Sequence, residues 1–188
     1  MRLKNVLSFP WNMTLGAIND DKLIFDIGKR IGEQMVRLGI HMNLAPVLDI
    51  NTNSKNPIIG NRSFGESSSI VVRQSLEVMK GMHSSMVLTS GKHFPGHGDT
   101  SKDSHKTLPT VKFGKKRIRE VELEPFRALI QEGLSSVMIA HLNIPSIQEK
   151  GLPTTLSKSV VTNLLKYELG FNGLILTDAL DMKGVTEV

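Results

Sequence analysis

The side chains best suited to chemistry lie together in one stretch of the chain. Residues 91–105 read Gly-Lys-His-Phe-Pro-Gly-His-Gly-Asp-Thr-Ser-Lys-Asp-Ser-His, with three histidines and two aspartates interrupted by glycine and proline. A polar loop of this kind costs conformational entropy to order, so its ionisable groups are candidates for a functional role. Three interpretations of the stretch compete.

The first interpretation is a metal site. The available ligands are His93, His97, Asp99, Asp103 and His105. His93 and His97 are four residues apart, but the proline and glycine between them argue against a helix that presents both. No H-E-x-x-H or H-x-H spacing occurs in the chain. A metal site is therefore supported only by the presence of suitable ligand residues, because their spacing matches no known metal-binding motif.

The second interpretation is acid–base catalysis. Histidine has an ordinary pKa of about 6.5, so it can give or take a proton at neutral pH. Asp103 precedes His105 by two residues, and in an extended segment such side chains point the same way. The carboxylate could then orient the imidazole and stabilise its charged form. A nucleophile is still required, and Asp178, at the end of another expected strand, can supply it.

The third interpretation gives the stretch no chemical role. A solvated loop can carry histidines that only satisfy nearby backbone groups. Residue types and spacing alone leave all three interpretations open.

The segments around this stretch alternate between helical and strand patterns. Helices are expected over residues 20–38, 68–82 and 117–132, and between a capping Ser157 and Gly170. Asn19 or Asp20 can cap the first helix, and Pro125 should divide the third. Strands are expected over residues 41–48, 86–89, 136–140 and 174–176.

Each expected strand is apolar and runs directly into polar residues. Strands that alternate with helices imply a parallel sheet, and polar groups at the strand ends are the layout of a (β/α)₈ barrel. An open doubly wound sheet is the alternative, but no G-x-G-x-x-G follows a strand. A complete barrel needs about 250 residues, so the 188-residue chain is expected to be a truncated barrel or a smaller fold.

The composition narrows the possible partners. The chain has no cysteine, which excludes disulfides and thiolate metal sites, and no apolar run reaches the roughly 20 residues of a membrane span. The net charge is +5, and the densest basic cluster covers residues 112–119. We expect this cluster to be a solvated helix start, because a chain with one Trp and one Tyr gives little support for a nucleic-acid patch.

Five stretches in order resemble one family. The run from Lys92 to Thr100, continued by Asp103-Ser104-His105 and Leu108-Pro109, resembles the signature loop of the bacterial N-acetylglucosaminidases of glycoside hydrolase family 3. Residues 43–49 resemble a barrel strand of that family, and residues 61–65 its arginine-bearing loop. Residues 138–141 and 174–182 resemble two later strands. The resemblance implies an α/β fold of the (β/α)₈ TIM-barrel type.

The resemblance also implies roles for individual residues. His105 matches the family's general acid/base, Asp103 its dyad partner and Asp178 the nucleophile. Asp181 is a rival carboxylate, but it is expected to begin the turn after the strand. The residues expected to bind substrate are Arg62, Lys92, His93 and His141, together with Arg2 as the end of a further binding loop.

The implied reaction removes terminal β-linked N-acetylglucosamine with retention, through a covalent glycosyl-aspartate. An acid/base on this loop points to the β-N-acetylhexosaminidase branch, which needs no metal or cofactor. The expected partner is a carbohydrate substrate, such as a muropeptide in peptidoglycan turnover or a chitin fragment. Two alternatives are a metal-dependent hydrolase using the histidine-rich loop and an inactive carbohydrate-binding fragment.

The resemblance covers residues 1–188 as a partial N-terminal barrel domain. The family's barrel begins upstream of this chain, and its last strand–helix unit is missing here, so truncation at both ends is expected. An open barrel leaves unpaired strand edges and exposed apolar faces. We therefore expect the isolated chain to be poorly stable or to aggregate.

Overall fold

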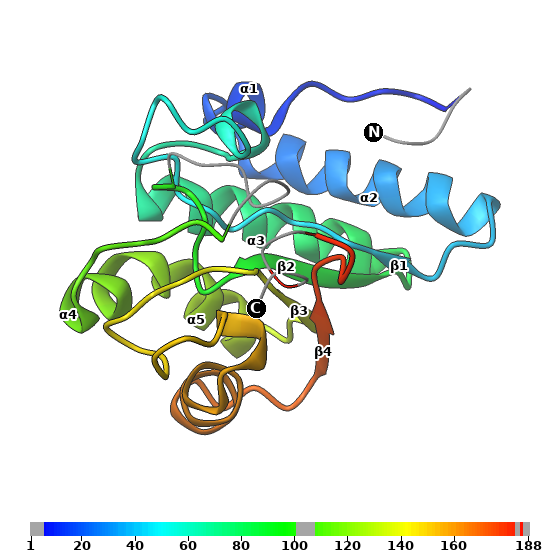
Figure 1. Cartoon of the computed structure of the whole chain (residues 1–188). Coiled ribbons are helices and arrows are strands. Elements are labelled where there is room, and N and C mark those ends of the chain that lie inside the picture. The colour runs from blue at the N-terminus through cyan, green and yellow to red at the C-terminus, as the bar shows by residue number, and fades with distance from the viewer. Residues whose placement is uncertain (1–5, 101–107, 183–184, 186–188) are drawn as a thin grey trace.

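The computed structural model describes residues 6–100, 108–182 and 185 (Figure 1). These residues form a parallel four-stranded sheet in which the spatial order of the strands equals their order in the chain. The strands are β1 (Met42–Asn43), β2 (Leu88–Phe94), β3 (Ser136–Ile139) and β4 (Leu174–Thr177). Parallel neighbours joined in sequence require crossover connections, and here helices supply them. The expected alternation of strands and helices in an α/β fold is confirmed.

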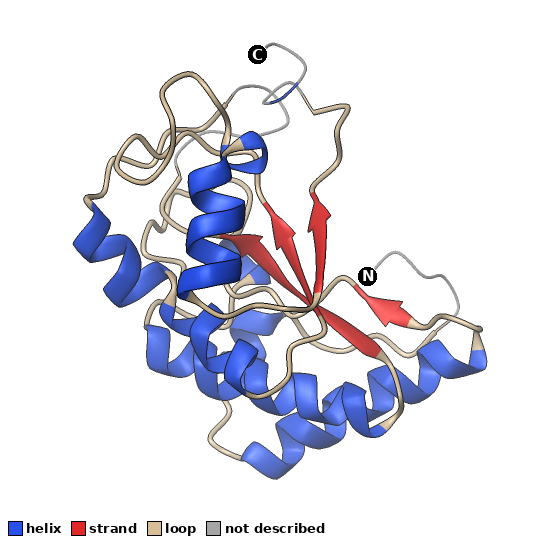
Figure 2. Ribbon diagram, turned by 90° about the horizontal axis from the view of Figure 1, so that it is seen from below, coloured by secondary structure: helices blue, strands red, loops and turns tan. Residues whose placement is uncertain are grey.

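The longer helices are α2 (Asp21–Arg37), α3 (Ser68–Ser84), α5 (Glu124–Gln131) and the π-helical η4 (Ser159–Glu168). The short ones are α1 (Asn12–Gly16), η1 (Gly60–Arg62), α4 (Lys115–Arg117), η2 (Ile118–Glu122) and η3 (Thr154–Leu156). Figure 2 shows the helices along one side of the fan of strands. The chain thus covers one face of its sheet with helices, as the units of a (β/α)₈ barrel do.

Local sequence signals explain where the helices begin. The side chain of Asp20 accepts a hydrogen bond of 3.0 Å from the Leu23 amide, and Ser157 Oγ accepts one of 3.2 Å from the Val160 amide. Both caps were expected from the sequence. Pro125 stands in the first turn of α5, where its missing amide hydrogen costs nothing. The helical stretch is therefore divided before that proline.

Helices α2 and α3 lie side by side and pack closely (Figure 1). A Cβ atom at Gly28 would lie 2.3 Å from the Val78 carbonyl oxygen, so the two backbones approach too closely for any larger residue there. Ile24 of α2 and Val71 of α3 are completely buried in the same layer. Glycine at the crossing point lets the two apolar faces meet.

The main core lies between the sheet and the later helices. It is built from Leu48, Phe94, Phe126, Val137 and other fully buried apolar side chains. The rings of Phe94 and Phe126 meet edge to face, with centroids 5.1 Å apart, and this contact fixes the end of β2 against α5. The end of β2 therefore rests on a packed base, just where the polar loop begins.

Three elements differ from their expected form. The strand expected over residues 86–89 is found at Leu88–Phe94, so Lys92 and His93 lie within β2 and not in the loop after it. The strand expected over residues 41–48 pairs continuously only at Met42–Asn43, and pairing resumes at an isolated bridge between Val47 and Lys92. Pro46 interrupts the strand, because proline has no amide hydrogen for the ladder. The helix after Ser157 has π-type hydrogen bonding and not the expected α-type; nothing in the structure explains that choice.

The basic cluster at residues 112–119 has intramolecular partners. Arg119 binds Glu168 of η4 through two hydrogen bonds of 2.8 and 2.7 Å, and Arg117 Nε lies 3.2 Å from Glu122 Oε1. Lys116 Nζ lies 3.8 Å from Glu120. These ion pairs connect the basic cluster to carboxylates of η2 and η4, so its charges are used inside the folded chain. Among the helices that the structure describes, none is long and apolar enough to cross a membrane.

Candidate active site

A buried carboxylate organises the loop at the end of β2. Asp49 is 1% exposed and follows the chain segment that pairs with β2. Its Oδ2 lies 2.6 Å from His93 Nδ1, and its Oδ1 accepts a hydrogen bond of 2.7 Å from the His97 amide. The His93 amide also donates to Asp49 Oδ2 at 3.2 Å. One carboxylate thus fixes His93, in β2, and His97, in the loop that follows.

The hydrogen bonds of His93 determine which ring nitrogen carries its hydrogen. Arg62 Nη2 lies 3.2 Å from His93 Nε2, and a guanidinium group can only donate. Nε2 therefore accepts, and the hydrogen on Nδ1 is donated to Asp49. Arg62 Nη1 also donates to the Ile58 carbonyl oxygen at 3.1 Å, which holds the arginine over the histidine. Asp49, His93 and Arg62 form one continuous chain of hydrogen bonds.

Burial and charge set the pKa values in this group. Burial alone would raise the pKa of Asp49, but its interactions with His93 and His97 outweigh burial and hold that pKa below its usual range. Burial lowers the pKa of His97, and the charge of Asp49 offsets this only in part. Asp49 is thus the ionised member of the group, and His97 resists protonation.

The loop itself is cradled by the segment before η1. Asn56 Nδ2 donates to the carbonyl oxygens of His97 and Gly98, at 2.8 and 3.0 Å. A Cβ atom at Gly98 would lie 1.8 Å from the Ile50 carbonyl oxygen, so only glycine fits this approach. Lys92, in β2, is half-buried, and its carbonyl oxygen accepts a hydrogen bond of 2.6 Å from the Leu48 amide. The motif's spacing therefore reflects close backbone packing as well as chemistry.

Asp178 lies directly after β4. Its amide donates to the Ile139 carbonyl oxygen at 2.9 Å, which continues the β3–β4 ladder by one residue. Its Oδ1 accepts a hydrogen bond of 2.8 Å from the Ala179 amide, and the side chain is half-buried. Asp181 lies beyond it in an exposed turn, as expected from the sequence. Asp178 is the carboxylate that the sheet itself positions.

His141 lies directly after β3 and is 1% exposed. Its Nδ1 is 2.6 Å from Thr155 Oγ1, and its Nε2 is 3.0 Å from the Ala179 carbonyl oxygen. Both ring nitrogens are engaged by protein groups in this structure. The sugar contact expected for His141 stays a prediction.

The predicted site residues divide into three groups. Arg62 and His93 are in direct contact, with Lys92 next in the chain, and His141 is joined to the segment of Asp178 through Ala179. Arg2, Asp103 and His105 lie outside the described residues. Within the part of the chain that the structure describes, no three His, Asp or Glu side chains are placed to hold a metal ion.

Sequence reasoning gave no role to Asp49. The available signal was its place at the end of an apolar segment, the same signal that singled out Asp178. Its partners lie 44 and 48 residues away, in β2 and in the loop after it, so nothing local in the sequence links them to Asp49.

Comparison with known proteins assigns the family. The profile described as "Glycosyl hydrolase family 3 N terminal domain" matches residues 1–188. Among solved structures, a glycoside hydrolase family 3 β-N-acetylglucosaminidase from Paenibacillus sp. is 43% identical with a TM-score of 0.95, over 99% of this chain and 36% of that one. NagZ from Neisseria gonorrhoeae, solved with N-trifluoroacetyl-D-glucosamine, is 31% identical with a TM-score of 0.87, over 95% of this chain and 54% of that one.

Curated relatives agree with the structures. "Beta-hexosaminidase A" of Pseudoalteromonas piscicida is 37% identical over 96% of this chain and 32% of its own length. "Beta-hexosaminidase" of Neisseria meningitidis serogroup C is 35% identical over 93% of this chain and 50% of its own length. The chain thus spans about a third to a half of these relatives. The resemblance seen in the sequence is confirmed: the chain belongs to glycosyl hydrolase family 3 and to the TIM-barrel type of its N-terminal domain.

Proposed function

We propose that the complete polypeptide carrying this chain is a β-N-acetylhexosaminidase that removes terminal β-linked N-acetylglucosamine from glycans. The observation that carries the proposal is the chain of hydrogen bonds Asp49–His93–Arg62 at the end of β2, together with Asp178 at the end of β4. The carboxyl ends of parallel strands share one edge of the sheet, which is where barrel enzymes of this type bind substrate.

The first part of the proposal concerns sugar binding. Arg62, Lys92 and His93 bind the sugar hydroxyls, and Asp49 holds His93 and Arg62 in place before substrate arrives. Guanidinium and ammonium groups donate strong hydrogen bonds to hydroxyl oxygens, and an anchored donor loses little freedom on binding. Arg2 and His141 were predicted to contribute further contacts, and for Arg2 that prediction is part of the proposal.

The second part concerns the chemistry. The Asp178 carboxylate attacks the anomeric carbon while His105, oriented by Asp103, gives its proton to the glycosidic oxygen, so that the bond to the leaving group breaks. Water then attacks the same carbon and passes a proton to His105, which frees Asp178 from the glycosyl-enzyme. Two displacements at one carbon retain its configuration. This route needs no metal and no cofactor.

The identity of the natural glycan is also proposed here. The names of the relatives identify β-hexosaminidases and β-N-acetylglucosaminidases, and one of them was solved with an N-acylated glucosamine. These names support an N-acetylglucosamine-containing glycan for this protein. A muropeptide, and hence peptidoglycan turnover, is the proposed natural source, with chitin fragments as the other outcome of a substrate screen.

The test is release of chromophore from an aryl N-acetyl-β-glucosaminide by the complete polypeptide, beside the aryl β-glucoside. We expect turnover of the N-acetyl substrate and its loss by at least about 10³-fold in Asp178→Asn, because removing a nucleophile removes the covalent route. Asp181→Asn is the matched control, since it removes a carboxylate three residues away, and it should keep wild-type turnover. Wild-type turnover in Asp178→Asn, or its loss only in the control, would transfer the role to another residue.

A further inference from the structure

His141 connects the ends of β3 and β4. The ring is almost completely buried after β3, and its Nε2 lies 3.0 Å from the carbonyl oxygen of Ala179, the residue that follows Asp178. A carbonyl oxygen only accepts hydrogen bonds, so Nε2 carries the hydrogen. His141 therefore donates to the main chain directly behind the proposed nucleophile.

Ala179 passes this contact on to Asp178. Its carbonyl oxygen accepts from His141 and also from the Met182 amide at 3.2 Å, while its own amide donates to Asp178 Oδ1 at 2.8 Å. The peptide groups on both sides of Ala179 are thereby fixed by hydrogen bonds. The carboxylate orientation of Asp178 depends on the position of this one residue.

The other side of His141 rests on a rigid base. Its Nδ1 lies 2.6 Å from Thr155 Oγ1, in η3. That helix is tied to the end of β3, because Thr154 Oγ1 donates to the Ala140 carbonyl oxygen at 2.6 Å and the Thr154 amide donates to the Leu142 carbonyl oxygen at 2.8 Å. The imidazole is thus held between a fixed helix and the Asp178 segment.

We propose that His141 is a positioning residue for the nucleophile: its Nε2–H holds the Ala179 carbonyl, and Ala179 in turn orients the Asp178 carboxylate. This inference rests on the proposed function of Asp178. It replaces the sugar contact predicted for His141 with a contact to the protein, because its Nε2 donates to the main chain directly behind Asp178. Displacement of a reacting group by about 1 Å can cost on the order of 100-fold in rate.

A matched pair of variants separates the two sides of the ring. In His141→Gln the amide nitrogen can occupy the place of Nε2 and keep the bond to Ala179. In His141→Asn the shorter amide can occupy the place of Nδ1, so it keeps the contact with Thr155 and loses Ala179. Both variants remove the same aromatic ring from the core, so they share the packing loss, and the difference between them reports the Ala179 hydrogen bond.

We expect His141→Asn to lower kcat by about 10- to 100-fold with little change in KM, because the nucleophile is misplaced while the sugar-binding groups remain. His141→Gln should restore most of the lost kcat. The measurement is kcat and KM for the aryl N-acetyl-β-glucosaminide with the complete polypeptide, beside thermal melting. Thr155→Val keeps the ring and removes its Nδ1 partner, together with the hydrogen bond from Thr155 Oγ1 to the Ala140 carbonyl oxygen. It should lower kcat more mildly, and it covers the case in which His141→Asn does not fold.

The outcomes distinguish this inference from the proposed function. Trapping the wild type with a fluorinated N-acetylglucosaminyl fluoride and mapping the labelled peptide tests Asp178 by itself; no label at Asp178 would overturn the proposed function. If Asp178 is labelled but His141→Asn keeps wild-type kcat, or if glutamine and asparagine lower kcat equally, the positioning role is overturned. A rise in KM with unchanged kcat would return His141 to the sugar-binding group.

Discussion

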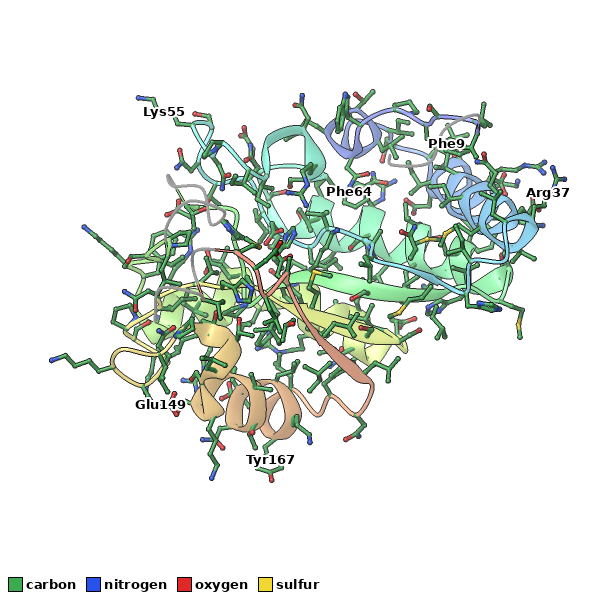
Figure 3. The ribbon with its side chains drawn as sticks, turned by 45° about the vertical axis from the view of Figure 1, so that its right-hand side comes forward. Phe9, Arg37, Lys55, Phe64, Glu149 and Tyr167 are labelled. Carbon is green, nitrogen blue, oxygen red and sulfur yellow. The ribbon has the colours of Figure 1, made fainter. Side chains whose placement is uncertain are left out.

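The two halves of the candidate site are built differently. On the β1–β2 side, Asp49 and His93 are buried, and the Asp49 carboxylate accepts hydrogen bonds from the His93 ring and from the His97 amide. On the β3–β4 side, Asp178 is half-buried, and its segment is held by hydrogen bonds to main-chain groups and to His141. Figure 3 shows Phe64, two residues after Arg62, inside the molecule, whereas Lys55 and Tyr167 point outwards.

This difference fits the two chemical tasks proposed for the two sides, which are sugar binding and nucleophilic attack. A group that binds sugar hydroxyls gains from a rigid, preorganised network, since ordering it on binding would cost affinity. A nucleophile must keep a free oxygen lone pair directed at the substrate, and a dense set of donors around it would weaken its attack. Bonds to the main chain behind Asp178 hold its position without occupying the carboxylate as fully as the bonds at Asp49 do.

The largest effect is expected where the β1–β2 side relies on close backbone packing. Gly98→Ala would place a Cβ atom 1.8 Å from the Ile50 carbonyl oxygen, so the loop or the strand segment must shift. We expect the free energy of unfolding to fall by about 3 kcal/mol, at the upper end of overpacking costs. Chemical denaturation of the complete polypeptide measures the change.

Gly114→Ala is the control for that substitution. A Cβ atom at Gly114 would meet nothing within 4 Å, and the residue has an ordinary φ of −72°. Its stability should equal or slightly exceed the wild type, because alanine restricts the unfolded chain more than glycine does. Equal losses in the two variants would show that the approach of Gly98 to Ile50 has no special weight.

A smaller effect is expected when one oxygen of the Asp49 carboxylate, which holds both His93 and His97, is exchanged for an amide nitrogen. Asp49→Asn replaces a carboxylate oxygen with a donor that faces either His93 Nδ1 or the His97 amide. If the new amide NH2 group faces His93 Nδ1, that nitrogen must accept and the ring hydrogen must move to Nε2. The Nε2–H group and the Arg62 N–H group would then be two donors facing each other. We expect kcat/KM to fall by about 10- to 100-fold, as for the loss of about 1.5–3 kcal/mol from a charged hydrogen bond.

The kinetic signature of Asp49→Asn sharpens the comparison between the two halves. A weaker hydrogen-bond network around Asp49 should appear mainly as a higher KM, because this side is proposed to bind the sugar. The His141 variants should instead lower kcat. Steady-state rates over a range of substrate concentrations separate the two. A fall in kcat alone for Asp49→Asn would mean that both halves serve the chemical step.

The sequence predicted the helices, strands and helix caps better than the hydrogen bonds that connect the site residues. Apolar strands ending in His141 and Asp178, the caps at Asp20 and Ser157, and the division before Pro125 are local signals, and each was found in the structure. Periodicity and capping are properties of neighbouring residues, so the sequence carries them directly.

The role of Asp49 and the relay through Ala179 could not be predicted in the same way. Asp49 meets its partners across 44 and 48 residues, and Ala179 takes part through its carbonyl group, which is the same in every residue type. Such contacts depend on register and on loop packing, which only the folded chain defines. Pro46, which shortens β1, was visible in the sequence, but its effect on pairing depends on the neighbouring strand.

The smallest expected effect is a dependence of stability on pH. Burial lowers the pKa of His97, so the folded state binds its proton less readily than the unfolded state, whose histidine titrates near about 6.5. Its contribution to stability is complete above that pH and is lost as the pH falls towards the folded pKa. Burial also lowers the pKa of His83, which therefore acts in the same direction. The stability that comes from the lowered pKa of Asp49 is complete above about 3.9 and is lost only at lower pH, outside this range.

Denaturation of the complete polypeptide between about pH 7.5 and pH 5 should therefore show a decreasing free energy of unfolding, with at most about 1.4 kcal/mol per pH unit for each proton taken up. His97→Asn, whose amide can still face Thr100 Oγ1, removes this titrating group and should flatten the decrease; His83→Asn measures the share of the other histidine. An unchanged slope in His97→Asn would mean that His97 protonates without opposition from the fold. The loop beside Asp49 would then be less tightly closed than its buried hydrogen bonds require, and the contrast between the two halves of the site would weaken.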